Sequence, residues 1–197
     1  MHESRQSSAL CLQKNKYIYV SGGKGRNCVE RFDLENNQWT KMSRMNIVRY
    51  MHASCALGDY VYVFCGTPGF FTTSFGANID YDFALIECLD TKKENSPWVI
   101  INTPTTSSVE FLLKPAVAAL NKNQVIIFGG QTVHEEKEVY SDDTYGHDAV
   151  VFDIRDHSMK RFFPIGITQG FICHSNTCIQ AGDDVILANV SDSLGDS

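Results

Sequence analysis

The residue types that most often perform chemistry are scattered along this chain without the spacing of a catalytic or metal site. The histidines considered as ligands or bases form no His-Glu-x-x-His or similar pattern; they are His52, His134, His147, His157 and His174. Gly22-Gly23-Lys24-Gly25 is rich in glycine but lacks the G-x-x-x-x-G-K-[ST] pattern of a phosphate-binding loop. We therefore predict no catalytic residue, no metal ligand and no cofactor.

The cysteines argue for a reducing compartment. There are seven, an odd number, and no Cys-x-x-Cys occurs; they are Cys11, Cys28, Cys55, Cys65, Cys88, Cys173 and Cys178. Most lie inside apolar runs of strand character, which is typical of buried, reduced thiols and not of a disulfide framework. A metal site at Cys173, His174 and Cys178 is disfavoured because these residues occupy strand positions. We predict a cytoplasmic protein.

Charge and hydropathy exclude several classes of partner. The 197 residues carry a formal charge of −6, which argues against a nucleic-acid groove or an anionic membrane surface as the main partner. No apolar run reaches 18 residues, and Met1 to Arg5 begin no secretory signal. With 43% hydrophobic and 20% charged residues, the composition is that of a soluble globular protein.

The elements that must position any site are short strands. Runs rich in β-branched and aromatic residues alternate with Gly, Asn and Asp clusters, and no long segment has helical periodicity. The clearest stretch runs from Tyr17 to Trp39, with Gly22-Gly23 after one strand, Asp33 after the next and Trp39 in the last. Preceded by a strand at 9–12, it predicts a four-stranded antiparallel unit.

This unit repeats along the chain. Tyr17 and Tyr60 are 43 residues apart, and the segment from Val125 to Gly130 again has a strand followed by a glycine pair. A fourth copy begins at Ser175 and stops, with Asn189-Val190 where the glycines should be. The chain therefore holds about three and a half units.

Four-stranded units with these residues resemble the kelch repeat. The residues that carry the resemblance are Gly22, Gly23, Asp33, Trp39, Gly66, Asp90, Trp98, Gly129, Gly130 and Asp153. The resemblance implies an all-β fold, a kelch-type β-propeller of four-stranded antiparallel blades. We predict a tail at 1–7, repeats over 8–190 (about 8–48, 49–103, 111–163 and a partial unit at 171–190) and a polar tail at 191–197.

The number of blades raises the question of how the ring closes. Propellers have about four to eight blades, and an open arc exposes an apolar face and strand edges. Missing sequence, another chain or a strand from elsewhere would complete it. We favour a fragment of a longer propeller.

Two long insertions are the predicted binding elements. The distance from the glycine pair to the aspartate is 10 residues in the first unit, but 24 and 23 in the second and third. In a meander, these loops between strands two and three emerge on the same rim as the connectors between blades, and loops often carry binding. The predicted partner-binding residues are Arg49, Phe70, Phe71, Phe75, His134, Glu135, Glu136, Asp142, Asp143 and Tyr145. The phenylalanines can equally fold back onto the rim, and the acidic loop can be solvated.

The resemblance implies a protein-binding scaffold or adaptor that is not an enzyme, in a setting such as a cytoskeletal or ubiquitin-ligase-type assembly. The alternative is a propeller enzyme or small-molecule binder with a site at the central channel mouth. That alternative needs titratable groups around the channel, whereas the first strands carry Ala9, Leu10, Ala53, Ala118 and Ala119. This favours binding of a protein partner, with no nucleic acid and no membrane insertion.

Overall fold

The fold is built from β-strands. The structure, a computed structural model, describes residues 1–67, 86–103, 114–130 and 149–161, and the backbone of 112–113, 131–132, 162, 171–173, 178–181, 184–187 and 190–192. Every regular element within these residues is a strand, as predicted. In this described part, no helix has the length and apolar character needed to cross a bilayer.

Three sheets have the same topology. Each contains four antiparallel strands in the order of the sequence. Blade 1 consists of β1 (Ala9–Gln13), β2 (Tyr17–Ser21), β3 (Val29–Asp33) and β4 (Gln38–Met42). Blade 2 consists of β5 (Ala53–Leu57), β6 (Tyr60–Phe64), β7 (Ile86–Asp90) and β8 (Trp98–Ile101). Blade 3 consists of β10 (Ala116–Asn121), β11 (Gln124–Phe128), β13 (Ala149–Asp153) and β14 (Met159–Phe162).

The remaining strands form pairs. β16 (Cys178–Ala181) and β17 (Asp184–Leu187) pair as the first two strands of the predicted partial unit. β15 (Phe171–Cys173) pairs with β18 (Val190–Asp192), and β9 (Leu112–Leu113) pairs with β12 (Gln131–Thr132) at the base of blade 3.

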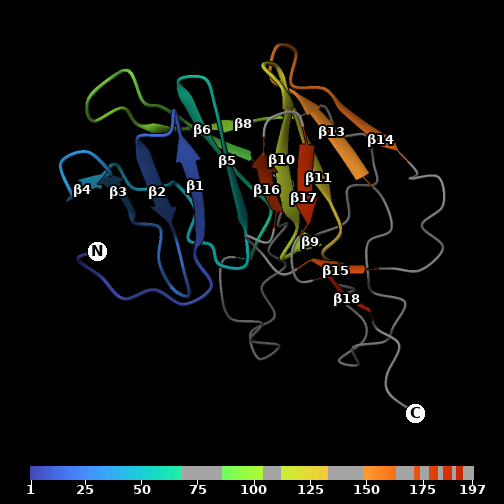
Figure 1. Ribbon diagram of the computed structural model, residues 1–197, viewed down its shortest axis with the longest axis horizontal. Coiled ribbons are helices and arrows are strands. Elements are labelled where there is room, and N and C mark those ends of the chain that lie inside the picture. The colour runs from blue at the N-terminus through green and yellow to red at the C-terminus, as the bar shows by residue number, and fades with distance from the viewer. Residues whose placement is uncertain are drawn as a thin grey trace, which may run out of the picture.

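The sheets succeed one another around a common axis. β1 lies beside β5, β5 beside β10, and β10 beside β16, so the first strands of successive units are innermost neighbours (Figure 1). This is the arrangement of blades in a β-propeller.

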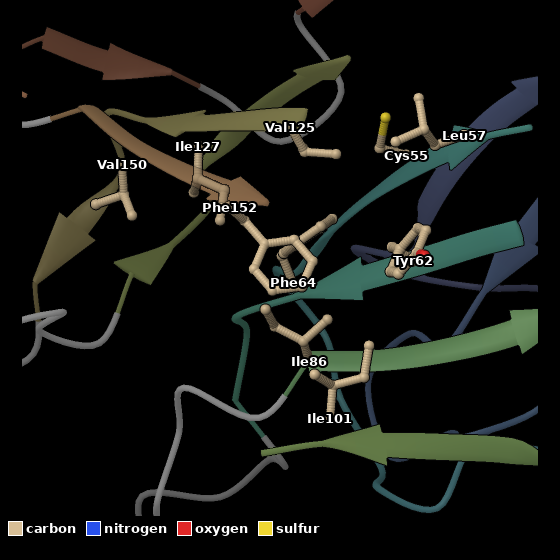
Figure 2. Close-up of a cluster of buried hydrophobic side chains, with 10 residues drawn as sticks. All are labelled: Cys55, Leu57, Tyr62, Phe64, Ile86, Ile101, Val125, Ile127, Val150 and Phe152. Carbon is tan, nitrogen blue, oxygen red and sulfur yellow. The ribbon is translucent and has the colours of Figure 1, made fainter. Parts of the chain in front are cut away.

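The core lies between the blades because side chains of a strand alternate between its two faces. In β6, Val61 and Val63 belong to the cluster shared with blade 1, whereas Tyr62 and Phe64 belong to the cluster shared with blade 3. Figure 2 shows Phe64 close to Phe152 of β13, and their ring centroids are 5.8 Å apart with the planes at 73°. Blade 2, which has a neighbour on each side, is therefore buried on both faces.

The repeated aspartates form turns. Asp33 Oδ1 accepts the backbone N–H of Glu35 at 2.9 Å, and Asp90 Oδ1 accepts that of Lys92 at 3.0 Å. In blade 3, Asp153 Oδ1 accepts the N–H of Arg155 at 3.0 Å. Because a carboxylate that binds the N–H two residues later stabilises a turn, this residue recurs between the third and fourth strands.

A backbone ladder links the entrances of the three blades. Ser7, Met51 and Lys114 each stand two residues before a first strand, and all have left-handed φ angles of 55–56°. The Met51 N–H donates to the Ser7 carbonyl at 3.0 Å, and the Lys114 N–H donates to the Met51 carbonyl at 2.8 Å. Successive units are thus joined near the axis by main-chain hydrogen bonds as well as by apolar packing.

Candidate interaction surface

In blade 1, the loop between strands two and three shares one edge of the sheet with the connector to blade 2. In blade 1, the Met45 N–H donates to the Asn27 carbonyl at 2.9 Å, and Asn27 Nδ2 donates back to the Met45 carbonyl at 2.8 Å. The Arg49 N–H reaches the Arg26 carbonyl at 3.2 Å. The short loop at 22–28 and the connector at 43–51 therefore form one continuous rim in blade 1.

The first glycine of the pair is required by close packing at this rim. Gly22 has a φ of 59°, and a Cβ there would lie 2.4 Å from the Arg49 carbonyl oxygen and 2.7 Å from His52 Cε1. Gly66 is equally enclosed, since its Cβ would lie 2.5 Å from His52 Cβ. Only glycine combines this backbone conformation with the space that the next connector leaves.

Arg49, predicted to bind a partner, is buried between blades 1 and 2. Its Nη1 donates to the Cys65 carbonyl at 2.9 Å, and its Nη2 donates to Glu87 Oε1 at 2.8 Å. Glu87 also accepts the backbone N–H of Asn46 at 2.7 Å. Arg49 and Glu87 are 3% and 0% exposed, so these contacts give Arg49 a packing role.

Blade 1 contains a second copy of this arrangement, outside the residues that carry the kelch pattern. Arg5 Nη1 donates to the Gly22 carbonyl at 2.8 Å, and Arg5 Nη2 donates to Glu30 Oε2 at 3.0 Å. Burial raises the pKa of Glu30, but hydrogen bonds from the His2 N–H and from Arg5 outweigh this effect and bring the pKa to about 2. Because Arg5 and Arg49 each stand four residues before a first strand, the spacing could have revealed the pair.

Residues 1–7 therefore occupy the place that a connector occupies in blade 2. The His2 N–H donates to Glu30 Oε1 at 2.7 Å, as the Asn46 N–H does to Glu87. The predicted boundary at residue 8 stays a prediction, but the segment before it contributes to blade 1.

Blade 3 replaces the ion pair with apolar residues. Counting from the first strand, Leu112 stands at the arginine position, and by strand register Val150 stands at the glutamate position. Val150 is buried in the cluster between blades 2 and 3. Blade 3 lacks both the arginine and the glutamate, because either charge without its partner would be uncompensated in the interior.

A serine and a histidine meet beside the glycine pair. Ser21 Oγ lies 2.9 Å from His52 Nε2, and both residues are fully enclosed. Burial lowers the pKa of His52 to about 3, with a further contribution from the Arg49 charge, so the imidazole is neutral at physiological pH. Within the described residues, no carboxylate binds Nδ1 and no substrate could reach the pair, so it does not resemble an activated nucleophile.

The cysteines seen in the structure are also structural. Cys11, Cys28, Cys55, Cys65 and Cys88 are present as thiols. Burial raises the pKa of Cys11 to about 12 and that of Cys88 to about 11, which keeps both protonated and unreactive. Across the residues that the structure describes, no group of three His, Cys, Asp or Glu side chains is arranged to hold a metal ion.

Nine of the predicted partner-binding residues lie outside the described residues: Phe70, Phe71, Phe75, His134, Glu135, Glu136, Asp142, Asp143 and Tyr145. The ends of their loops are described. Thr67, the last residue before the first loop, exchanges backbone hydrogen bonds with Tyr50 of the connector at 2.9 and 3.0 Å. The first loop thus begins at the edge that carries the blade 1 rim, while the binding role of these residues stays a prediction.

Comparison with known families supports the repeat. Residues 7–46 match the Kelch motif, and this range covers all four strands of blade 1 and the start of its connector. The chain contains a kelch repeat. Blades 2 and 3 repeat the topology of the matched segment, with its turn aspartate and at least one glycine after the second strand. A search of curated proteins found no match.

Kelch repeats are commonly protein-interaction modules, and the observed architecture is that of kelch blades in a β-propeller. The glycines, turn aspartates and paired arginines of this kelch chain all serve its scaffold.

Proposed function

We propose that this kelch chain is a protein-interaction scaffold or adaptor that binds its partner through the rim carrying the loops between strands two and three. The rim of blade 1 carries the proposal, because there the strand 2–3 loop and the connector form one hydrogen-bonded edge. The sequence departs most from the repeat in blades 2 and 3, where residues 68–85 and 133–148 extend the equivalent loop.

The two insertions offer different chemistry. The first contains Phe70, Phe71 and Phe75, and aromatic side chains are frequent anchors of protein interfaces. The second contains five carboxylates between residues 135 and 143, which would attract a basic surface. A partner with a basic segment next to an apolar one fits both loops.

The setting we propose is cytoplasmic, in a cytoskeletal or ubiquitin-ligase-type assembly, with the ring completed by further sequence or another chain. Reduced, buried thiols suit this compartment. The channel-mouth alternative has less support, because Ala9, Ala53 and Ala116 on the innermost strands are buried and apolar.

Affinity capture with rim variants tests the proposal. Replacing Phe70, Phe71 and Phe75 with serine should abolish capture of the partner that the wild-type chain retains. Neutralising Glu135, Glu136, Asp142 and Asp143 to their amides should weaken capture and reduce its dependence on salt.

The matched control is Tyr60→Ser, which removes an aromatic side chain that is 41% exposed at the opposite, hairpin edge. This variant should retain the partner. If both rim variants unfold at the wild-type temperature and still capture the same protein, the rim is not the interface.

A further inference from the structure

The Arg5 side chain fills a polar socket on the side of blade 1 that faces away from blade 2. Its Nη1 donates to the carbonyls of Gly22 and Cys28 at 2.8 and 2.7 Å, and its Nη2 donates to Glu30 Oε2 at 3.0 Å. The side chains of Arg5 and Glu30 are only 1% and 2% exposed, so the guanidinium is enclosed. We call the Glu30 carboxylate and the carbonyls of Gly22 and Cys28 the blade 1 socket.

Blade 2 binds an arginine in the same way. Arg49 Nη1 donates to the Cys65 carbonyl, and Arg49 Nη2 donates to Glu87 Oε1. Cys65 directly follows β6 as Gly22 follows β2, and Glu87 is the second residue of β7 as Glu30 is of β3. The socket therefore belongs to the four-stranded sheet, and it selects a planar guanidinium that bonds a carboxylate and a carbonyl at once.

The two segments that supply these arginines are anchored differently. Counting from the first strand, Met1 is equivalent to Met45, and each stands four residues before its arginine. Met45 is 1% exposed in the cluster between blades 1 and 2, whereas Met1 is 52% exposed. Residues 1–7 contain no other apolar side chain, so hydrogen bonds and ion pairs hold this segment on blade 1.

The ion pairs beside the socket are made by Glu3. Its carboxylate pairs with Arg26, and its Oε1 lies 3.9 Å from Lys41 Nζ. The side chains of Arg26 and Lys41 are 39% and 66% exposed, and exposed pairs contribute little because water and salt compete for them. Residues 1–7 thus combine one enclosed arginine with weak flanking contacts.

We propose that the blade 1 socket is an exchangeable binding site for an extended, arginine-bearing segment of a second protein, and that residues 1–7 are its internal competitor. The incoming guanidinium takes the place of Arg5 on Glu30, so the buried carboxylate has a cationic partner in both states. Because residues 1–7 fill the socket, the apparent affinity for the second protein is reduced to the fraction of sockets that are empty. Changes that release residues 1–7 therefore strengthen binding.

Fluorescence anisotropy of a labelled peptide tests the proposal on the full chain. The peptide consists of residues 43–51, whose Arg49 fits the equivalent position of blade 2. Glu3→Lys leaves the socket intact but replaces two ion pairs with repulsion, so it should tighten peptide binding about fivefold over the wild type. Arg5→Ala empties the socket and should tighten binding at least about tenfold.

Two controls remove the recognition itself. The peptide with Arg49→Leu should bind at least about tenfold more weakly, because it lacks the guanidinium. Arg5→Ala combined with Glu30→Gln removes both charges of the pair and should lose the gain that Arg5→Ala alone gives. The unchanged peptide should also raise the urea midpoint of Arg5→Ala, since a ligand that binds the folded state stabilises it.

Peptide affinity that neither Glu3→Lys nor Arg5→Ala raises would overturn the proposal, as would binding that persists with Arg49→Leu in the peptide or Glu30→Gln in the chain. If Arg5→Ala does not fold, the comparison of Glu3→Lys with the wild type decides, because Arg5 and Glu30 stay paired in both. None of these variants changes the insertions at 68–85 and 133–148, so a negative result leaves the proposed scaffold function standing.

Discussion

Gly22 shows how one position decides the packing of two blades. Its left-handed φ and the nearby Arg49 carbonyl each exclude a side chain. Gly58 has a similar φ of 60°, but a Cβ at that position would meet no other atom within 4 Å. Substitution of Gly58 therefore tests the backbone strain alone, whereas substitution of Gly22 adds a steric clash.

We predict that Gly22→Ala lowers the free energy of unfolding by about 3 kcal/mol, from left-handed strain and a clash with rigid backbone. Gly58→Ala should cost only about 1 kcal/mol because it suffers the strain alone. Urea denaturation measures both. Equal losses for the two variants would show that the rim does not enclose Gly22.

His52 gives stability a pH dependence. Its pKa in the folded protein is about 3, below the ordinary value of 6.5, so the unfolded chain binds a proton more readily than the folded one. Stability should therefore fall as the pH drops from 6.5 towards 3. We expect the slope of the unfolding free energy between pH 6 and 5 to be smaller in His52→Gln, by up to about 1.4 kcal/mol per pH unit.

Urea midpoints of the wild type and His52→Gln at several pH values provide the measurement. The pKa of Glu30 is about 2 in the folded protein, below its ordinary value of 4.5. Protonation of Glu30 therefore lowers the stability mainly below pH 5 and has little effect on the slope between pH 6 and 5. Parallel curves above pH 5 would contradict a buried, neutral His52.

At the scale of the element, the arginine–glutamate pair anchors the connector to the third strand of the blade that follows it. Breaking a buried pair leaves one charge without its partner, which costs about 3–5 kcal/mol. We predict a loss of this size for Arg49→Leu, because Glu87 is fully buried.

Blade 3 supplies the compensating change. With Leu112 and Val150 as the precedent, Arg49→Leu combined with Glu87→Val should be more stable than Arg49→Leu alone, by at least about 1 kcal/mol. A double-mutant cycle in urea measures the coupling. Lys93→Ala is the control, since the exposed Lys93–Asp90 pair at 3.5 Å should contribute less than about 1 kcal/mol. Additive losses for Arg49 and Glu87 would contradict the pairing.

At the scale of the whole molecule, side-chain packing between neighbouring blades stabilises the fold. Phe152 is fully buried against Phe64 and Tyr62, so Phe152→Ala should cost about 3–5 kcal/mol. Because each blade of an array contacts only its neighbours, amide hydrogen exchange should accelerate in blades 2 and 3 more than in blade 1. Uniform acceleration across all three blades would show a single cooperative unit instead.

The sequence alone determined the repeat, the strands and their order. Gly22-Gly23, Asp33 and Trp39 reflect local requirements for turns, backbone angles and sheet packing, and the patterns around them predicted the three four-stranded sheets that the structure contains. The partial fourth unit stays a prediction. The prediction that the strand 2–3 loops share an edge with the connectors also follows from strand alternation, and the contacts of Asn27 with Met45 agree with it.

Tertiary structure decided what individual charged and polar residues do. The sequence predicts Arg49 at the binding surface, but its guanidinium lies between blades, and Arg5 and Glu30 form the same arrangement without belonging to the kelch pattern. Such pairs join segments more than 20 residues apart, so their burial depends on how sheets stack and not on local pattern. For the same reason, only the stacking shows that Trp98 is buried while Trp39, its equivalent in the repeat, is only partly buried.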